Sequence, residues 1–383
     1  MVKQLQEGGH TAYLVGGCVR DLLMGLTPKD FDISTTARPR QVKKLVKNAF
    51  IIGRRFRLVL VRRGEIQYEV STFRRGLLPG ENAEELPDGD NIFGTPKQDA
   101  QRRDYTCNAL FYDPVKQTVL DYTNGIQDMK DGWLKLIGKP EDRLPEDPIR
   151  ILRAIRFSAK LGLQIEPTLN QGLAEFADEL KLSPLPRKRE EFLKILTLKN
   201  PGRAFTALKD LKVIDKILPT FESLTLEEGS LRKVFNIIES LDYEHRMSLD
   251  PAQLLGVFSW ATAITANSDF EYEELLTWIK DESIQKFMKF ELGAFNAELT
   301  HIEQAFRILP ALLDYNAFSQ KGPRRRLGLL SQRSFPLALF FYALISGPDL
   351  GIWIDAFNGR DSIEGLHLDD SDEKTDEYEE EGD

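Results

Sequence analysis

Residues 25–35 read GLTPKDFDIST, and together with LVGGCVRD (14–21) they decide the fold. The alternation after the proline turn predicts a strand that places Asp30 and Asp32 on one face and Phe31 on the other. The earlier segment predicts a strand that runs through two glycines into a short helix. A pair of carboxylates on one strand face indicates either a metal site or an ordinary half-exposed strand.

The composition is that of a globular protein with two or three domains. The chain has 383 residues, of which 42% are hydrophobic and 29% charged, and it contains no apolar run of membrane-spanning length. Its two cysteines, Cys18 and Cys107, exclude a disulfide framework and fit the reducing cytoplasm. The N-terminus lacks the apolar core of a signal peptide and begins almost on the first predicted strand, which fits a truncated start.

The charge is unevenly distributed along the chain. Residues 365–383 contain ten acidic residues and one lysine, a net charge of −9 that equals the charge of the whole chain. This tail is expected to be disordered and solvated, with an autoinhibitory or partner-binding role as the alternative. Residues 38–75 contain twelve Lys or Arg against two Glu. They indicate either a nucleic-acid-binding face or solvated helix and strand surfaces.

The pattern of elements changes near residue 140. Before it, short strands alternate with helices, including strands over 109–113 and 118–122. After it, helical segments follow one another, beginning with EDPIRILRAIRFSAKLGL (146–163). The sequence therefore predicts an α+β protein: an α/β head of about 135 residues followed by an all-α part.

A third carboxylate is available to the aspartate pair. In QYEVST (67–72), alternation separates Glu69 from Tyr68 and Val70. If this strand lies beside the one that carries Asp30 and Asp32, three like charges converge, which is costly unless a cation neutralises them. Mg²⁺ accepts a few carboxylates together with substrate phosphates. Solvent-facing strand surfaces remain the alternative.

The glycine turn is the second element with possible chemistry. Gly16 and Gly17 allow the backbone to approach a phosphate, and the helix that follows offers free N–H groups. Arg20 and Asp21 lie one turn into that helix. The alternative is a tight strand-to-helix turn without a ligand.

The third element is RRDYTCNAL (102–110). Arg102 and Arg103 are candidates for holding phosphates. Asp104 is a candidate either for the metal site or for orienting an arginine, and helix capping is the alternative.

The fourth element is the polar stripe at the start of segment 146–163. Asp147, Arg150, Arg153 and Arg156 recur every three residues. Asp147 before a proline is well placed to cap the helix. The functional interpretation is base recognition: a carboxylate and a guanidinium complement the amino group and ring nitrogen of adenine or cytosine, whereas guanine and uracil offer a carbonyl instead.

Five ordered motifs resemble one protein family. GGCVRD, DFD, EVSTFR, RRDYTCNAL and EDPIRILRAIRFSAKLG together resemble the class II nucleotidyltransferases, the bacterial poly(A) polymerases and CCA-adding enzymes. The resemblance is dense over residues 11–163 and continues thinly over 185–219. It implies a polymerase-β-like palm in the head, a neck that selects the nucleotide and helical RNA-binding parts.

The resemblance also implies roles for individual residues. Asp30 and Asp32 would bind Mg²⁺ and, with Glu69 and Asp104, form the catalytic set. The implied nucleotide contacts are Gly16, Gly17, Arg20, Asp21, Arg103, Asn108, Asp147, Arg150, Arg153 and Arg156. Cys18 and Cys107 depart from the small and aliphatic residues common at their positions.

The segment IIGRRFRLVLV (51–61) resembles the poly(A) polymerase branch of the family, and so does QKGPRRRLGLL later in the chain. The expected RNA contacts are Arg54, Arg55, Arg57, Arg324, Arg325 and Arg326. We therefore expect a monomeric polynucleotide adenylyltransferase acting on RNA 3′ ends with ATP. A CCA-adding enzyme using CTP and ATP is the alternative, and a catalytically silent RNA-binding protein is a third interpretation.

The resemblance also gives the expected domains. They are a head over 1–137, a helical neck over 138–219, an all-α RNA-binding body over 220–364 and the acidic tail over 365–383.

Overall fold

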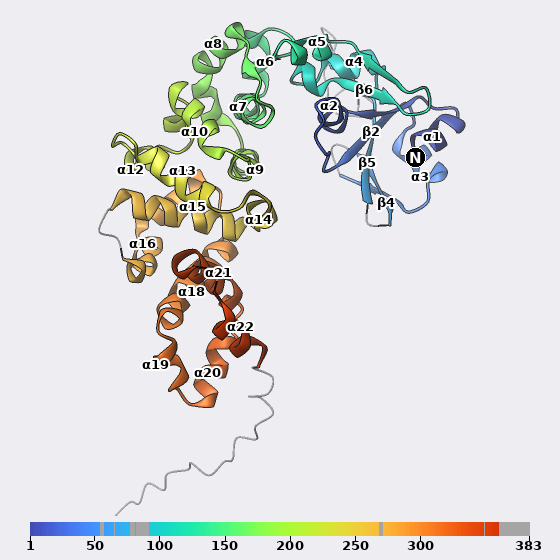
Figure 1. Ribbon diagram of the computed structural model, residues 1–383. Coiled ribbons are helices and arrows are strands. Elements are labelled where there is room, and N and C mark those ends of the chain that lie inside the picture. Colours follow the sequence, from blue (N-terminus) through green and yellow to red (C-terminus); the bar gives the residue numbers. More distant parts are fainter. Residues whose placement is uncertain are drawn as a thin grey trace, which may run out of the picture. The chain divides into compact units, whose positions relative to one another are not determined.

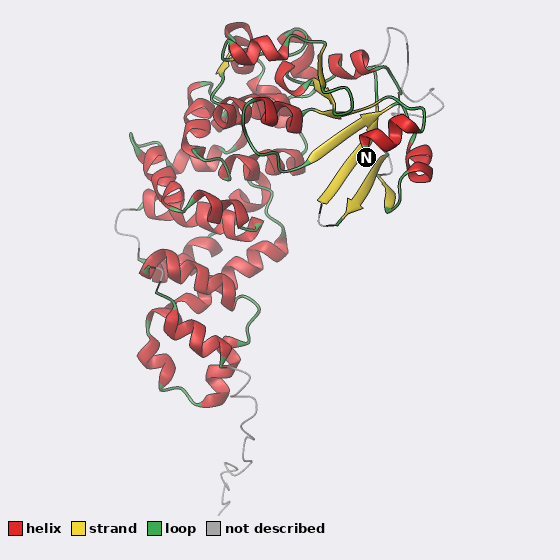
Figure 2. Cartoon of the chain, turned by 45° about the vertical axis from the view of Figure 1, so that its right-hand side comes forward, coloured by secondary structure: helices red, strands yellow, loops and turns green. Residues whose placement is uncertain are grey.

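The computed structural model describes residues 1–53, 57–64, 66–76, 81, 92–267, 271–347 and 349–359. The chain divides into two compact units, Met1–Pro219 and Thr220–Asp383. Figure 1 shows the order of the elements, and Figure 2 shows the strands gathered in the N-terminal part of the chain. Arg54, Arg55 and the acidic tail, which were singled out above, lie outside the described residues.

A seven-stranded mixed sheet forms the centre of the head, in the order β3-β4-β5-β2-β1-β6-β7. Its strands are β1 (Ala12–Val15), β2 (Phe31–Thr35), β3 (Ala49–Ile52), β4 (Leu58–Arg63), β5 (Ile66–Thr72), β6 (Leu110–Asp113) and β7 (Thr118–Asp121). β2 and β5 are parallel neighbours, and the other pairs of adjacent strands are antiparallel. The two carboxylate-bearing strands are therefore neighbours, which was the condition for their carboxylates to converge.

One face of the sheet is covered by apolar side chains from two helices. Ile33, Val59 and Val70 are almost fully buried against a cluster that includes Val42 and Val46. The covering helices are α1 (Val2–Glu7), which packs beside β1, and α3 (Pro39–Leu45), which packs against β3, β4 and β5. Both are labelled in Figure 1. This burial fixes the register of β2, because a slip of one residue would turn its aspartates into the core.

Two further clusters hold the other half of the sheet. Val15, Phe73 and Phe111 pack with Ala100 of α4 (Pro96–Gln101). Cys18 and Val19 of α2 (Gly17–Leu23) pack on Leu110. These contacts anchor α2 and the segment after α4, and both contribute side chains to the site described below.

Helices make up most of the remainder of the first unit. They are α5 (Gly125–Lys130), α6 (Pro140–Glu146), α7 (Ile149–Leu161), α8 (Pro167–Glu175), α9 (Leu185–Leu196), α10 (Pro201–Asp210) and α11 (Ile214–Ile217), with α12 (Pro219–Leu224) at the boundary. Short strands β8 (Trp133–Leu134) and β9 (Gln164–Ile165) form a separate parallel pair. α7 packs against α9 and α10.

The capping role expected for Asp147 is wrong. α7 begins after Pro148 without a side-chain cap, and Asp147 ends α6 instead. The Asp147 carboxylate faces Arg187 of α9, and its two oxygens accept hydrogen bonds from that guanidinium at 2.7 and 2.9 Å. The ion pair gives the carboxylate two charge-assisted hydrogen bonds, where a cap bonds the N–H of one residue, so the carboxylate turns away from the helix end.

The second unit is helical throughout its described residues. Its longer helices are α13 (Ser230–Ser240), α15 (Pro251–Ala266), α18 (Asn296–Leu313) and α21 (Phe335–Ser346). Its shorter ones are α14 (Tyr243–Ser248), α16 (Leu275–Lys280), α17 (Glu282–Lys286), α19 (Tyr315–Ser319), α20 (Pro323–Leu330) and α22 (Gly351–Asn358). Aromatic pairs join these helices, with Phe221 and Phe258 at 4.9 Å between ring centroids and Phe306 and Phe341 at 4.8 Å.

No single helix among the described residues has both the length and the apolar character to cross a membrane. The pair α20 and α21, bent by 86°, meets those two criteria only when its members are taken together.

The α+β fold class is confirmed. Strand β3 was not predicted, because its four residues AFII carry no period-2 alternation. The finer division into head, neck and body stays a prediction.

Candidate functional site

Three carboxylates gather at the end of the parallel strand pair. Asp32 of β2 lies directly opposite Glu69 of β5 in the strand register. Asp30 immediately precedes β2, and all three side chains are exposed. The arrangement follows from alternation in both strands, which buries Ile33 and Val70 on the opposite face.

Asp32 carries the electrostatic signature of this crowding. Its pKa is raised to about 6, first because surrounding protein atoms displace water although the side chain still reaches solvent, and then because Glu69 and Asp30 repel its charge. Arg103 acts in the opposite direction. A carboxylate that resists ionisation beside two others is poised to gain from a bound cation.

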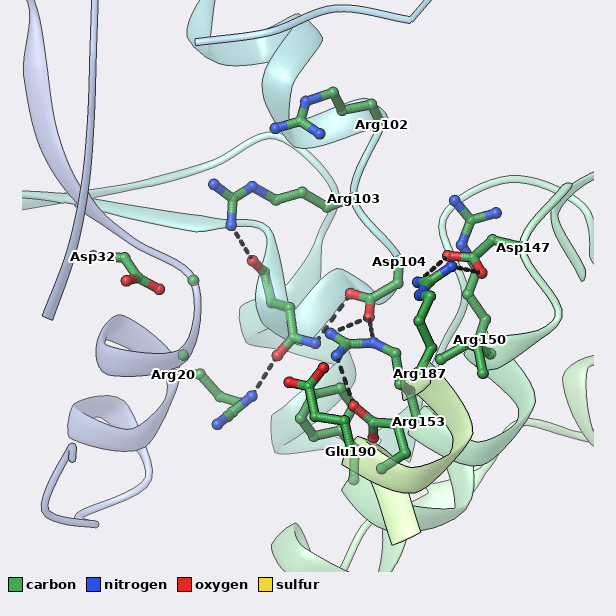
Figure 3. Close-up of a pocket in the computed structure, with 16 residues that line it drawn as sticks. Arg20, Asp32, Arg102, Arg103, Asp104, Asp147, Arg150, Arg153, Arg187 and Glu190 are labelled. Carbon is green, nitrogen blue, oxygen red and sulfur yellow. Dashed lines mark hydrogen bonds and ion pairs between the residues drawn. The ribbon is translucent and has the colours of Figure 1, made fainter. Parts of the chain in front are cut away.

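A cleft of about 540 Å³ opens beside Asp32. Its lining is rich in guanidinium and carboxylate groups, and Figure 3 shows Asp32 at one side, Asp147 at the other and arginines between them. The lining residues are Gly16, Gly17, Arg20, Asp32, Arg102, Arg103, Asp104, Asn108, Asp147, Ile149, Arg150, Arg153, Phe157, Arg187, Glu190 and Glu191. Eight of the ten predicted nucleotide contacts are among them; Asp21 and Arg156 are not.

The glycine turn brings backbone close to the cleft. Gly16 has φ 71°, a conformation that disfavours any side chain, and a Cβ atom there would lie 2.9 Å from Arg103 Nη1. Its N–H donates to the Leu110 carbonyl at 2.9 Å, which ties the turn to β6. The glycine is therefore required by the backbone conformation of the turn, and a side chain there would also displace the flexible end of Arg103.

Arg102 and Arg103 are held from behind by Asp99 of α4. Asp99 is 1% exposed, and its two oxygens pair with Arg102 and Arg103 at 2.9 Å. Burial acts to raise the pKa of Asp99, but the two guanidinium groups and the Arg74 N–H outweigh it, so the pKa lies below the usual range. The carboxylate thus stays charged and preorganises both cations at the cleft.

Asp104 is occupied by protein partners. Its oxygens accept from Arg153 Nε at 2.7 Å, Asn108 Nδ2 at 3.1 Å and the Tyr105 N–H at 2.8 Å. Burial acts to raise the pKa of Asp104, but Arg153 and these hydrogen bonds outweigh it and lower the pKa. Of the two predicted roles for Asp104, orienting an arginine is the one this geometry supports.

An ion-pair network connects α7 with α9. Arg153 reaches Glu191 at 3.4 Å, and Arg156 donates to Glu191 at 2.6 Å. Glu191 is 3% exposed, so the pair is shielded from solvent. Arg156 is buried, is not among the residues that line the cleft, and supports Glu191.

A second network joins the glycine turn's helix to α7. Arg20 pairs with Asp21 at 2.6 Å and donates to Asn108, while Lys160 of α7 donates to Asp21 at 3.0 Å. The Arg20 guanidinium also lies 5.1 Å from the Phe157 ring centroid. Asp21 therefore orients Arg20 from outside the cleft.

The predicted base-recognition pair has other partners in this structure. Asp147 is held by Arg187, and Arg150 pairs with Glu146 at 2.8 Å. A carboxylate has about four lone-pair sites, so Asp147 can accept from a base amino group while Arg187 stays bound.

Of the predicted RNA contacts, four lie in the described residues. Arg57 is exposed just before β4, and Arg324 and Arg325 are exposed on α20 of the second unit. Arg326, on the same helix, is half-buried.

Three charged residues of α9 and two residues of α7 were not predicted to line the cleft. They are Arg187, Glu190, Glu191, Ile149 and Phe157. The spacing of Arg187 and Glu191, four residues apart in a helix, places them on one face and was the available signal. The sequence pattern did not indicate that this face of α9 would pack against α7.

The arrangement suits a polyanionic ligand with a base. Cations and a glycine turn lie beside Asp32, and the Asp147 carboxylate lies across the cleft. Among the described residues, no three His, Cys, Asp or Glu side chains are placed to enclose a metal ion. Mg²⁺ is commonly held by one or two carboxylates plus substrate phosphates, so the carboxylates present fit such an ion.

Comparisons with known proteins agree on the type of domain. Residues 12–135 match the family described as "Poly A polymerase head domain", and residues 162–224 match "Probable RNA and SrmB- binding site of polymerase A".

Curated relatives include enzymes of both branches. The chain is 40% identical over 271 residues to Poly(A) polymerase I of Salmonella typhi, covering 67% of this chain and 58% of that protein. It is 39% identical over 290 residues to Poly(A) polymerase I of Escherichia coli O6:H1, covering 72% and 62%. A CCA-adding enzyme of Limosilactobacillus fermentum is 36% identical over 215 residues, covering 56% and 52%. The chain thus spans about three fifths of the length of the poly(A) polymerases it matches.

Among solved structures, the CCA-adding enzyme of Bacillus stearothermophilus in complex with CTP shares the fold. The TM-score is 0.63 at 21% identity, covering 94% of this chain and 80% of that one.

Proposed function

Because this chain belongs to the class II nucleotidyltransferase family, we propose that it transfers AMP from ATP to the 3′-hydroxyl of RNA. The 3′ oxygen forms a bond to the α-phosphorus, the bond from that phosphorus to the bridging oxygen breaks, and pyrophosphate leaves while the hydroxyl proton is lost. The higher identity to poly(A) polymerases than to CCA-adding enzymes supports adenylate addition.

One observation carries this proposal. Asp32 and Glu69 are direct partners in the strand register, and Asp32 lines a cleft that also presents Arg20, Arg102 and Arg103. A hard cation and a triphosphate need these two kinds of group side by side. An ordinary solvent-facing strand would not place its carboxylates against preorganised arginines.

We assign the metal ligands to Asp30 and Asp32, with Glu69 beside them, and the metal to Mg²⁺. When bound, Mg²⁺ would favour ionisation of the attacking hydroxyl and neutralise charge on the leaving pyrophosphate. Arg20, Arg102 and Arg103 would bind the phosphates, each already oriented by a carboxylate partner. Asp104 would keep Arg153 in place through the contacts described above.

Nucleotide selection is assigned to the far side of the cleft. Asp147 would accept from the N6 amino group of adenine, and Arg150 would donate to N1. GTP and UTP present a carbonyl at the first position, which leaves the carboxylate opposite an acceptor.

The same pair fits cytosine, so a CCA-adding enzyme is the second candidate function. The Asp147 carboxylate and the Arg150 guanidinium offer an acceptor and a donor that cytosine N4 and N3 match equally well. A catalytically silent RNA-binding protein would also keep the fold but would not need the carboxylate cluster.

The test is the initial rate of incorporation of each labelled nucleotide, supplied alone, into a short unstructured RNA with Mg²⁺. We expect ATP incorporation well above CTP, GTP and UTP. The variants Asp30→Asn and Asp32→Asn should lose ATP incorporation. Their melting temperatures should confirm that both variants are folded. CTP incorporation equal to ATP would favour the second candidate, and no incorporation of any nucleotide would favour the third.

We also propose that the protein is monomeric, and that it is cytoplasmic, as expected from its two cysteines. Both cysteines are buried and free, which is consistent with a reducing compartment.

A further inference from the structure

One cross-strand row runs from the carboxylates to the edge of the sheet. Asp32 is paired with Glu69, Glu69 with Leu60, and Leu60 with Phe50. These residues lie on β2, β5, β4 and β3, four consecutive strands of the sheet. Residues opposite one another in register project to the same face, so this face carries carboxylates at one end and an aromatic ring at the other.

This face differs from the one behind it. The opposite face carries Ile33, Val59 and Val70, which are at most 1% exposed under the two covering helices. Phe50, in contrast, is 56% exposed, and Ile52, next along β3 on the same face, is 41% exposed. A large aromatic side chain on an exposed edge strand marks an interaction surface rather than a core position.

A cation lies within the same face. Arg62 follows Leu60 by two residues on β4 and is exposed. It forms no ion pair with any residue in the part of the chain that the structure describes. The face therefore combines an aromatic ring, aliphatic surface and a cation, which is the set of groups that holds unpaired nucleic acid: bases stack on the ring and phosphates meet the cation.

We propose that the row surface, defined as Glu69, Leu60, Phe50 and Arg62, binds the unpaired segment just upstream of the RNA 3′ end, with a base stacked on Phe50 and a phosphate near Arg62. The inference rests on the proposed function, which places the 3′-hydroxyl at Asp32. Three strand spacings separate Asp32 from Phe50, about 14 Å. The stacked base is therefore not the terminal one but lies a few nucleotides upstream.

RNA is favoured over a protein partner by continuity and charge. The row surface begins at the carboxylates where an RNA end must arrive, and Arg62 adds an exposed positive charge on the same face. A strand of a partner protein that paired with β3 would form hydrogen bonds with the backbone of this edge strand. Such pairing would not require the Arg62 side chain on the face of the sheet.

The first experiment maps contact directly. A short unstructured RNA with 4-thiouridine at successive positions from the 3′ end is irradiated with the full-length protein without ATP, and the linked peptide is identified. We expect linkage to the peptide containing Phe50 from a position upstream of the terminus, and not from the terminal nucleotide. Linkage only to other peptides would overturn the proposal.

The second experiment measures the contribution of the ring. Phe50→Ala should raise the dissociation constant for single-stranded RNA about tenfold, the loss expected for one base–aromatic stack. Phe50→Trp should restore binding, and Ile51→Ala, on the same strand but the opposite face, should leave it unchanged. In turnover assays the effect of Phe50→Ala should fall on the KM for RNA and not on the KM for ATP.

These outcomes separate the inference from the proposed function. Cross-linking at Phe50 in a protein that incorporates no nucleotide would refute the function and keep the binding surface. If the protein incorporates ATP but Phe50→Ala leaves its RNA affinity unchanged, the proposed binding surface is refuted and the proposed function is kept. If the wild-type protein forms dimers and Phe50→Ala abolishes them without changing RNA binding, the face binds a second copy of the chain. That result would overturn the proposal.

Discussion

The Asp32 carboxylate suits a metal site, but its charge is unfavourable for folding. Its carboxylate lies opposite Glu69 and near Asp30, and its pKa is raised to about 6. Because the folded state disfavours the ionised form, the charge destabilises the fold at neutral pH. That penalty disappears as the pH falls below the ordinary aspartate pKa near 4, about where the unfolded chain also becomes protonated.

We therefore predict that Asp32→Asn abolishes transfer while keeping or raising the melting temperature at pH 7.5. Loss of a metal carboxylate should reduce the rate by about 10³-fold or more. The gain in melting temperature should shrink between pH 7 and pH 4. In addition, Mg²⁺ should raise the melting temperature of the wild type more than that of the variant.

Asp210→Asn, an exposed aspartate outside the cleft, is the matched control and should change neither activity nor the response to Mg²⁺. A clearly lowered melting temperature for Asp32→Asn would show that Asp32 stabilises the fold and would contradict this account.

Residues whose roles depend on alternation could be placed from the sequence. Asp30, Asp32 and Glu69 followed from a period of two, and burial of the opposite face enforces that period. The partner of Asp147 could not be placed, since Arg187 lies forty residues away on another helix. Capping and ion pairing compete for such a carboxylate, and only the packing of α7 on α9 decides between them.

At the scale of elements, the turn between β1 and α2 fixes one wall of the cleft. Gly16 adopts φ 71°, and a Cβ there would meet Arg103 Nη1 at 2.9 Å. At Gly17, by contrast, a Cβ would meet only Arg20 Nη2, at 3.7 Å, and φ is not in the strained region. The two adjacent glycines thus differ sharply in what they tolerate.

Gly16→Ala should accordingly destabilise the protein by about 1–3 kcal/mol, the usual range for a non-glycine residue held in the left-handed region. It should also raise the KM for ATP, because Arg103 must move. Gly17→Ala should cost little or no stability, which denaturant unfolding of both variants can check. Equal destabilisation by the two substitutions would mean that the turn conformation is not the cause.

If Asp147 selects the nucleotide as we propose, α9 contributes to that choice by orienting the carboxylate through Arg187. Removing the guanidinium in Arg187→Ala frees the carboxylate to rotate, so discrimination of ATP against GTP and UTP should fall by about tenfold, the scale of one bidentate contact. The measurement is the ratio of kcat/KM values for the separate nucleotides. Arg203→Ala, an exposed arginine on α10, is the control and should keep the ratio. An unchanged ratio in a folded Arg187→Ala protein would assign Arg187 a purely structural role.

Element prediction succeeded where a periodic face was buried and failed where it was not. β2, β5, β6 and α7 lie close to their expected ranges. β3 was missed because Phe50 and Ile52 remain exposed, so its sequence carries no alternation between core and solvent. The same exposure is the observation from which we propose an RNA-binding surface at β3.

At the scale of the whole molecule, the acidic tail should oppose RNA binding. Its charge of −9 accounts for the net charge of the whole chain, because the remaining residues are neutral in sum. Deleting residues 365–383 should leave catalysis intact and leave RNA affinity equal or higher, with the largest gain at low salt where repulsion is least screened. Dissociation constants at two ionic strengths test this. Weaker RNA binding by the truncated protein at low salt would mean that the tail supports the RNA-binding parts.

We propose that the cleft adds adenylate repeatedly to RNA ends of varied sequence. The most direct test of this proposal offers the purified protein a random-sequence RNA and a tRNA lacking its terminal CCA, with ATP and CTP supplied separately and together, and sizes the products. We predict long extensions on the random-sequence RNA that need only ATP and contain only A. Addition confined to the tRNA, stopping after C, C and A and requiring both nucleotides, would contradict the account and establish a CCA-adding enzyme.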